Sequence, residues 1–179
     1  IHATRTGYYI YKFIDPNLDL LQNRTSVHHW VIMRYAEILL SYAEAMNEAY
    51  GPTGNVGYRL NAVRALNQVR NRVGVEMPAV PTAISKEELR EKIRNERRVE
   101  LAFEDHRFWD VRRWMIAEQE GVMSGAMYGI KIYWINSSPQ EFRYTPYLYE
   151  NRTFTKKMYL HPFSTNEVNK GYLIQNPGY

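Results

Sequence analysis

Two glutamates, Glu96 and Glu100, lie four residues apart in Ser85–Trp114, a stretch with helical periodicity. Residues four apart share one face of a helix, so the two carboxylates can lie close together. A glycoside hydrolase needs such a pair, about 5–5.5 Å apart for retention of configuration or about 6.5–9.5 Å apart for inversion. The spacing alone therefore allows hydrolytic chemistry.

The surrounding arginines favour a structural role for these glutamates. Nearby cations keep a carboxyl group ionised, which removes the protonated acid that glycoside hydrolysis requires. A helix that turns carboxylates towards its packing face needs cationic partners, because an unpaired buried charge costs several kcal/mol. We therefore predict an ion-pair network that joins two helices, formed by Glu96, Arg97, Arg98, Glu100, Glu104, Arg112 and Arg113, with Arg107 nearby and with Phe103, Phe108, Trp109 and Trp114 packed around it.

The sequence gives little support for disulfides, a metal site or nucleic-acid binding. The chain has no cysteine, which excludes disulfides and thiolate metal sites. Glu104, Asp105 and His106 are adjacent, and adjacent residues on a helix point in different directions, so they do not converge as metal ligands. We predict no catalytic residue, no metal and no cofactor. The net charge is +4, but most arginines alternate with acids and form no basic run, so we predict no nucleic-acid partner.

Aromatic residues are frequent, with 15 Tyr and 4 Trp, and several follow the helical part of the chain. Sugar rings stack their apolar faces on aromatic side chains, while Asn and Arg side chains donate hydrogen bonds to sugar hydroxyls. The candidate ligand-binding residues are Trp134, Tyr133, Asn136, Arg143 and Tyr147. The alternative is that these aromatics pack irregular loops onto the helices.

The elements that would position these residues suggest one domain over residues 1–179, with an extended lead-in (1–30), a helical region (31–120) and an irregular, short-strand region (121–179). Apolar periodicity predicts helices over 31–50, 56–73, 86–104 and 106–118, and extended segments over 125–135, 142–149 and 153–160. Ser85 and Glu88 form a capping-box pattern at the start of the third helix. The predicted fold class is mostly α, with tetratricopeptide-like helix pairs and an irregular, partly β C-terminal region.

Four separated motifs occur in one order along the chain. They are the extended segment at 7–17, RYAEILLSYAEAMNEAYG at 34–51, NERRVELAFEDHRFWDVRRW at 95–114 and QNPGY at 175–179. Together they resemble the C-terminal portion of the SusD/RagB family, which are SusD-like outer-membrane glycan-binding lipoproteins of Bacteroidetes-type bacteria. The resemblance implies the SusD-like fold with its helix pairs.

The resemblance also implies a function. It is non-catalytic binding of a glycan or oligosaccharide at the bacterial cell surface, with delivery to a SusC-like TonB-dependent transporter. The implied location is the outer membrane, surface-exposed and lipid-anchored through an N-terminal part absent from this chain. Three alternatives stay open: a peptide ligand, a helical-repeat protein–protein scaffold without sugar affinity, and a glycoside hydrolase that uses Glu96 and Glu100.

Overall fold

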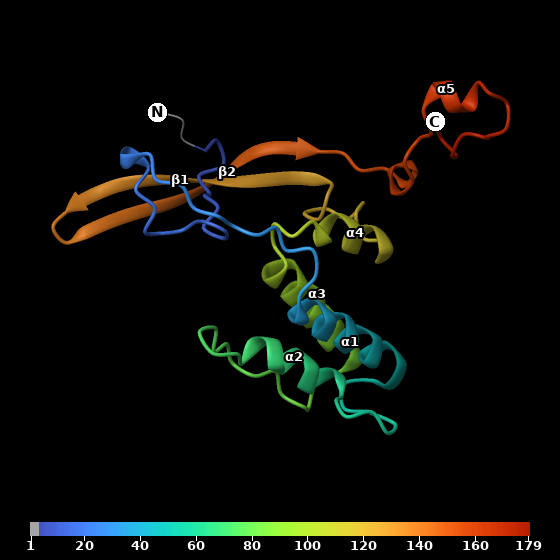
Figure 1. The fold of residues 1–179 in the computed structure, drawn as a ribbon, viewed down its shortest axis with the longest axis horizontal. Helices are drawn as coiled ribbons and strands as arrows, with labels where there is room; N and C mark the ends of the chain where they lie inside the picture. Colours follow the sequence, from blue (N-terminus) through green and yellow to red (C-terminus); the bar gives the residue numbers. More distant parts are fainter. Residues whose placement is uncertain (1–3) are drawn as a thin grey trace. The chain divides into compact units, whose positions relative to one another are not determined.

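The computed structural model describes residues 4–179. It divides into two compact units, which we treat separately: a helical unit, Val27–Phe108, and a hairpin unit made of residues 4–26 and Trp109–Tyr179. The elements, drawn in Figure 1, are η1 (Leu20–Gln22), α1 (Tyr35–Tyr50), α2 (Ala62–Arg70), α3 (Lys86–Glu100), α4 (His106–Arg113), β1 (Gly125–Ser137), β2 (Gln140–Arg152), η2 (Lys156–Tyr159) and α5 (Thr165–Val168). The predicted fold class, helix pairs followed by an irregular, partly β region, is confirmed.

The helical unit is built on α1, which packs against both α2 and α3 (Figure 1). Its core is continuous and consists of apolar side chains from the three helices and the segment between them. Ala43, Ala62 and Ala65 are fully buried, and their small side chains allow the helices to approach closely. Asn47 is also buried and donates to the carbonyl of Lys86 at 2.9 Å, which ties α1 to the start of α3.

The first two helices are shorter than the periodicity predicts. Helix α1 begins at Tyr35, four residues late, and Ile32 before it is 84% exposed. Helix α2 begins at Ala62 because Asn61 caps it: the Asn61 side chain accepts from the backbone N–H of Arg64 at 2.9 Å. Val56, predicted to be helical, instead has a φ of 40°.

Helix α3 starts as predicted and ends early. The Ser85 hydroxyl accepts from the backbone N–H of Glu88, and the Glu88 carboxylate accepts from the backbone N–H of Ser85, each at 3.1 Å. The helix ends at Glu100 rather than residue 104, since Phe103 and Asp105 both have φ of 62°, which an α-helix cannot contain. Periodicity carries no signal for this left-handed turn.

The hairpin unit contains one antiparallel pair, β1 and β2, in register from Gly125 opposite Arg152 to Ser137 opposite Gln140. The lead-in crosses β1, where the backbone N–H of Ile130 donates to the carbonyl of Thr6 at 2.8 Å. Gly129 allows this approach, because a Cβ there would lie 2.8 Å from the Thr6 oxygen.

The C-terminal segment folds back on residues 160–163 through side-chain amides. The Gln175 amide donates to the carbonyl of Phe163 and accepts from its N–H, both at 2.9 Å. The Asn176 amide donates to the carbonyl of His161 at 2.5 Å. Within the segment predicted to be extended, Lys156–Tyr159 is instead a short 3-10 helix.

Candidate functional site

The β1–β2 hairpin has two faces of different chemistry. Successive side chains of a strand point to opposite faces, and the register is regular from Tyr128 to Trp134. One face, which we call the apolar face, carries Tyr128, Ile130, Ile132, Trp134, Phe142, Tyr144, Pro146 and Leu148. The other, the polar face, carries Gly129, Lys131, Tyr133, Glu141, Arg143, Thr145 and Tyr147.

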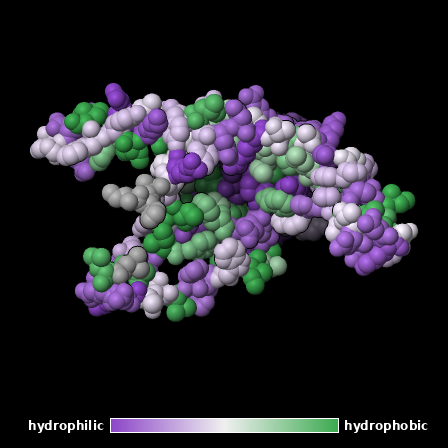
Figure 2. Space-filling model, turned by 90° about the horizontal axis from the view of Figure 1, so that it is seen from above, coloured by the Kyte–Doolittle hydropathy of each residue, from purple (hydrophilic) through white to green (hydrophobic). Residues whose placement is uncertain are grey.

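The apolar face is largely open to solvent. Trp134 is 68% exposed and Tyr144 is 59% exposed, and Ile132 and Leu148 are about half exposed. Figure 2 shows apolar residues among hydrophilic ones on one side of the molecule as a whole. A two-stranded hairpin with one apolar face is marginally stable on its own, so this face is suited to contact with another surface.

On the polar face, two cations lie over two tyrosine rings. The Lys131 ammonium lies 5.0 Å from the centre of the Tyr147 ring, and the Arg143 guanidinium lies 5.2 Å from the centre of the Tyr133 ring. The Tyr147 hydroxyl donates to the carbonyl of Arg5, which holds the ring against the lead-in. Each cation–ring contact is worth about 0.5–1 kcal/mol at an exposed position and orients the cation.

The five predicted ligand-binding residues therefore do not form one cluster. Tyr133, Arg143 and Tyr147 share the polar face, whereas Trp134 lies on the apolar face. The indole N–H of Trp134 donates to the carbonyl of Asn136 at 2.6 Å across a register shift near the hairpin tip. Strand alternation in the sequence was the signal that separates Tyr133 from Trp134.

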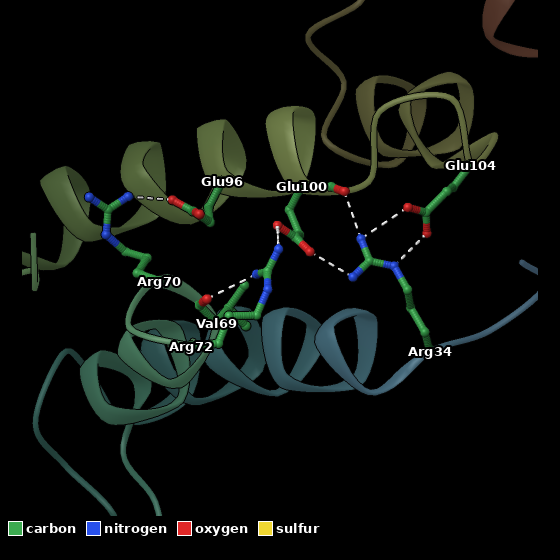
Figure 3. Close-up of polar contacts among 7 residues, drawn as sticks. All are labelled: Arg34, Val69, Arg70, Arg72, Glu96, Glu100 and Glu104. Carbon is green, nitrogen blue, oxygen red and sulfur yellow. Dashed lines mark hydrogen bonds and ion pairs between the residues drawn. The ribbon is translucent and has the colours of Figure 1, made fainter. Parts of the chain in front are cut away.

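In the helical unit, Arg34 connects α1 to the end of α3 (Figure 3). It precedes α1, and its guanidinium donates to both Glu104 carboxylate oxygens at 2.8 and 2.9 Å. It also donates to the Glu100 carboxylate and to the Glu100 backbone carbonyl, each at 2.6 Å. The Glu104 side chain is 1% exposed and that of Glu100 is 9% exposed. One arginine thus binds two nearly buried carboxylates and a carbonyl at the helix end.

The other partners come from α2 and the loop after it. Arg70 pairs with Glu96 at 2.5 Å, and Arg72 pairs with Glu100 at 2.8 Å, as Figure 3 shows. Neither arginine was among the predicted partners. They lie in a different part of the sequence, and only the packing of α2 and α3 against α1 brings them to the glutamates.

The predicted arginines differ in burial and in contacts. Arg97 is buried and donates to the Ser41 hydroxyl at 3.0 Å, while Arg98 is exposed. In the hairpin unit, the Arg112 guanidinium lies 5.2 Å from the centre of the Phe154 ring, and Arg113 pairs with Asp110 at 2.9 Å.

The predicted aromatic packing around the network is wrong for three residues. The exposed fraction is 56% for Phe103, 36% for Phe108 and 62% for Trp109. The reason for Phe103 is the left-handed turn, which takes it off the packed side of α3. Trp114 is half-buried, with the Arg113 guanidinium 4.8 Å from the centre of its ring.

The network is poorly suited to acid catalysis. Burial would raise the pKa of Glu100, but hydrogen bonds from Arg34 and Arg72 outweigh burial and hold that pKa below its usual range.

Within residues 4–179, no group of three or more His, Asp or Glu side chains could hold a metal ion. The described helices include none long and apolar enough to cross a membrane.

Comparison with known proteins identifies the family. The SusD family model matches residues 2–179. SusD-like protein P2 of Formosa agariphila is 35% identical over 111 residues, which are 59% of this chain and 20% of that protein. SusD-like protein P38 of the same organism is 33% identical over 106 residues, 56% of this chain and 18% of that protein. The chain thus spans about a fifth of the length of these curated relatives.

Solved structures also match this chain. A SusD-like protein of Bacteroides fragilis matches with a TM-score of 0.66 and 38% identity, over 84% of this chain and 26% of that one. A SusD-like carbohydrate binding protein of Bacteroides vulgatus shares the fold, with a TM-score of 0.51 and 24% identity, over 78% of this chain and 28% of that one. The resemblance carried by the four sequence motifs is confirmed, and the chain belongs to the SusD/RagB family.

Proposed function

We propose that this chain is part of a non-catalytic nutrient-binding protein of the bacterial cell surface, whose ligand is a glycan or oligosaccharide. In this proposal the protein lies at the outer membrane and is anchored by lipid. It delivers the ligand to a SusC-like TonB-dependent transporter. Membership of the SusD family supports the general activity.

The observation that carries the proposal for this portion is the hairpin, which exposes aromatic rings together with oriented hydrogen-bond donors. The Trp134 indole N–H is already bonded to the Asn136 carbonyl, so the ring is held in one orientation while 68% of the residue stays exposed. A held, open ring can stack on the apolar face of a sugar at a low entropic cost. Binding needs no bond to be broken, which agrees with a Glu100 pKa that lies below its usual range.

The alternation of the strands divides this site between two surfaces. Trp134 offers stacking on the apolar face, while Tyr133, Arg143 and Tyr147 offer polar contacts on the other. Near the hairpin tip the faces are separated only by the thickness of one two-stranded ribbon. An extended oligosaccharide that passes over the tip would contact both.

The test is calorimetric titration of the 179-residue chain with a panel of soluble polysaccharides. For a glycan that binds, we expect Trp134→Ala to weaken affinity at least about tenfold, since stacking on one aromatic ring is worth about 1–3 kcal/mol. Trp30→Ala is the matched control, because Trp30 is 60% exposed and lies in the helical unit. Equal losses in the two variants would place the site away from the hairpin.

A protein–protein scaffold is the second candidate, and the open apolar face specifically favours it. An exposed apolar surface of this kind commonly marks a protein interaction site. A scaffold predicts that no polysaccharide binds. It also predicts that Ile132→Lys, which puts a charge at the centre of the apolar face, weakens binding to a purified SusC-like transporter. Sugar binding that Trp134→Ala abolishes would reject the scaffold as the sole function.

A further inference from the structure

The polar face of the hairpin carries more positive than negative charge. Lys131 and Arg143 are exposed there, and in the described chain neither has an ion-pair partner. Glu141 is on the same face, nearer the tip, opposite Asn136. At the base of the hairpin, Glu150 is paired with Arg152. The middle of the polar face is therefore cationic.

The tyrosine rings set the orientation of these cations. A guanidinium that stacks on an aromatic ring still has its N–H donors directed outward along its own plane, where they can bind a carboxylate or sulfate in a forked arrangement. The Arg143 guanidinium lies over the Tyr133 ring, 5.2 Å from its centre, and the Lys131 ammonium lies over the Tyr147 ring. Because Tyr147 is itself bonded to the Arg5 carbonyl, its ring cannot turn away freely.

The two cations are also close enough to act on one ligand. Lys131 lies opposite Thr145, and Arg143 is two residues from Thr145 on the same strand. Such diagonal neighbours of an antiparallel pair are about 7–8 Å apart at the backbone. Both side chains can therefore reach anionic groups on one sugar residue or on adjacent ones.

An open groove adjoins the same tyrosine. It has a volume of about 380 Å³ and is lined by Arg5, Tyr147, Tyr149 and Glu150. Arg5 is exposed and, in the described chain, its side chain has no ion-pair partner. The groove extends the polar face towards the lead-in and adds a third cation beside Tyr147.

We propose that the polar face selects acidic oligosaccharides, which it binds through carboxylate or sulfate ester groups held by Lys131 and Arg143. This inference rests on the proposed glycan-binding function and specifies its ligand class. A neutral sugar would cover these cations without compensating their charge, whereas an anionic group forms charge-assisted hydrogen bonds with donors that are already oriented. Affinity should fall as salt is raised, because both cations are exposed.

The test compares two double variants of the 179-residue chain. Lys131→Gln/Arg143→Gln removes the two cations of the polar face. The control, Lys156→Gln/Arg64→Gln, removes the same charge from exposed positions outside the two strands of the hairpin. Each is titrated by calorimetry with neutral dextran, carboxymethyl-dextran and dextran sulfate, and with short oligosaccharides of neutral and uronic-acid polysaccharides.

We expect only the acidic ligands to bind. Their affinity should fall roughly 10- to 100-fold in the polar-face variant and should change by no more than about threefold in the control. The carboxymethyl and sulfate arms show which anion is preferred. A neutral glycan that binds and keeps its affinity in the polar-face variant would overturn the acidic class while leaving glycan binding intact. Equal losses of affinity in the two double variants would mean that the effect depends on net charge alone, which would also overturn the proposal. No binding in any arm would reject glycan binding by this chain together with the inference.

Discussion

Arg34 offers the sharpest test of the structure, because a single guanidinium binds two nearly buried glutamates. Arg34→Ala removes four hydrogen bonds, two to Glu104 and two to Glu100. The Glu104 carboxylate, with its side chain 1% exposed, loses its contacts with a cation that faces both of its oxygens. The C-terminal end of α3 also loses a donor to one of its last carbonyls.

The size of the effect follows from burial. Removing one partner of a buried ion pair costs about 3–5 kcal/mol, chiefly because the remaining charge is left in a poorly solvated place. The Arg34 side chain is 27% exposed, so water can partly replace it, and we expect a loss of about 3–4 kcal/mol in the free energy of unfolding. At about 2–4 °C per kcal/mol for a chain of this length, the melting temperature should fall by roughly 6–16 °C.

The chain provides a matched control in Arg90. Its guanidinium also binds a carboxylate with two bonds, to Glu48 at 2.6 and 2.7 Å, but the Glu48 side chain is 42% exposed. Arg90→Ala should therefore cost no more than about 1 kcal/mol. Urea unfolding followed by far-UV circular dichroism measures both losses, with unchanged m-values as the condition for comparison.

A difference of less than about 0.5 kcal/mol between the two variants would refute the reasoning, because burial would then have no influence on the cost.

A second variant separates the cost of the remaining buried charge from the cost of lost packing. Adding Glu104→Gln to Arg34→Ala should recover part of the loss, since a buried neutral amide is less costly than a buried carboxylate. No recovery would mean that packing of the Arg34 side chain, rather than charge, dominates.

Three further predictions concern other parts of the chain. Burial opposes ionisation of Glu100, but hydrogen bonds from Arg34 and Arg72 outweigh it and hold the folded-state pKa below the ordinary value of 4.5. The contribution of Glu100 to stability is therefore present above about pH 4.5 and is lost as the pH falls through the lower folded-state pKa, so acid unfolding of Glu100→Gln should lack this component. Ser85→Ala removes the helix cap of α3 and should cost about 1 kcal/mol in urea unfolding. Gly129→Ala should cost about 1–3 kcal/mol and speed amide exchange at Ile130, since the new Cβ would lie 2.8 Å from the Thr6 oxygen.

Each of these has an opposing result. An acid-unfolding curve of Glu100→Gln parallel to that of the parent chain would show that Glu100 titrates alike in the folded and unfolded states. A neutral effect of Ser85→Ala would mean that the start of α3 is held by packing alone. Unchanged protection at Ile130 in Gly129→Ala would mean that the lead-in does not approach β1 at this point.

Local patterns in the sequence were enough to locate the helices, the cap of α3 and the two extended aromatic segments that form β1 and β2. These features depend on residues within a few positions of each other: Ser85 and Glu88 satisfy each other's backbone, and alternating side chains build the strands. The helix ends were less accurate. The early end of α3 follows from left-handed conformations at Phe103 and Asp105, which are uncommon for these residue types and leave no pattern in the sequence.

The partners in the ion-pair network could not be predicted from nearby sequence. Glu100 has arginines close to it in the chain, but its contacts include Arg34, which precedes α1, and Arg72, which follows α2. Many arginines compete for few glutamates, and only the packing of α1, α2 and α3 decides the pairs. The predicted ligand-binding residues differ in this respect, since strict alternation along β1 already assigns Tyr133 and Trp134 to opposite faces.

The position of Arg34 in the chain also bears on the order of folding. Its partners Glu100 and Glu104 lie 66 and 70 residues further on, so forming these contacts closes a long loop at an entropic cost. The pair α1 and α2, joined by a short connection, can form first, and the arginine contacts then form late. Contacts absent from the transition state mainly control the rate of unfolding. Arg34 should therefore govern how long the folded helical unit lasts once formed, much more than how quickly it forms.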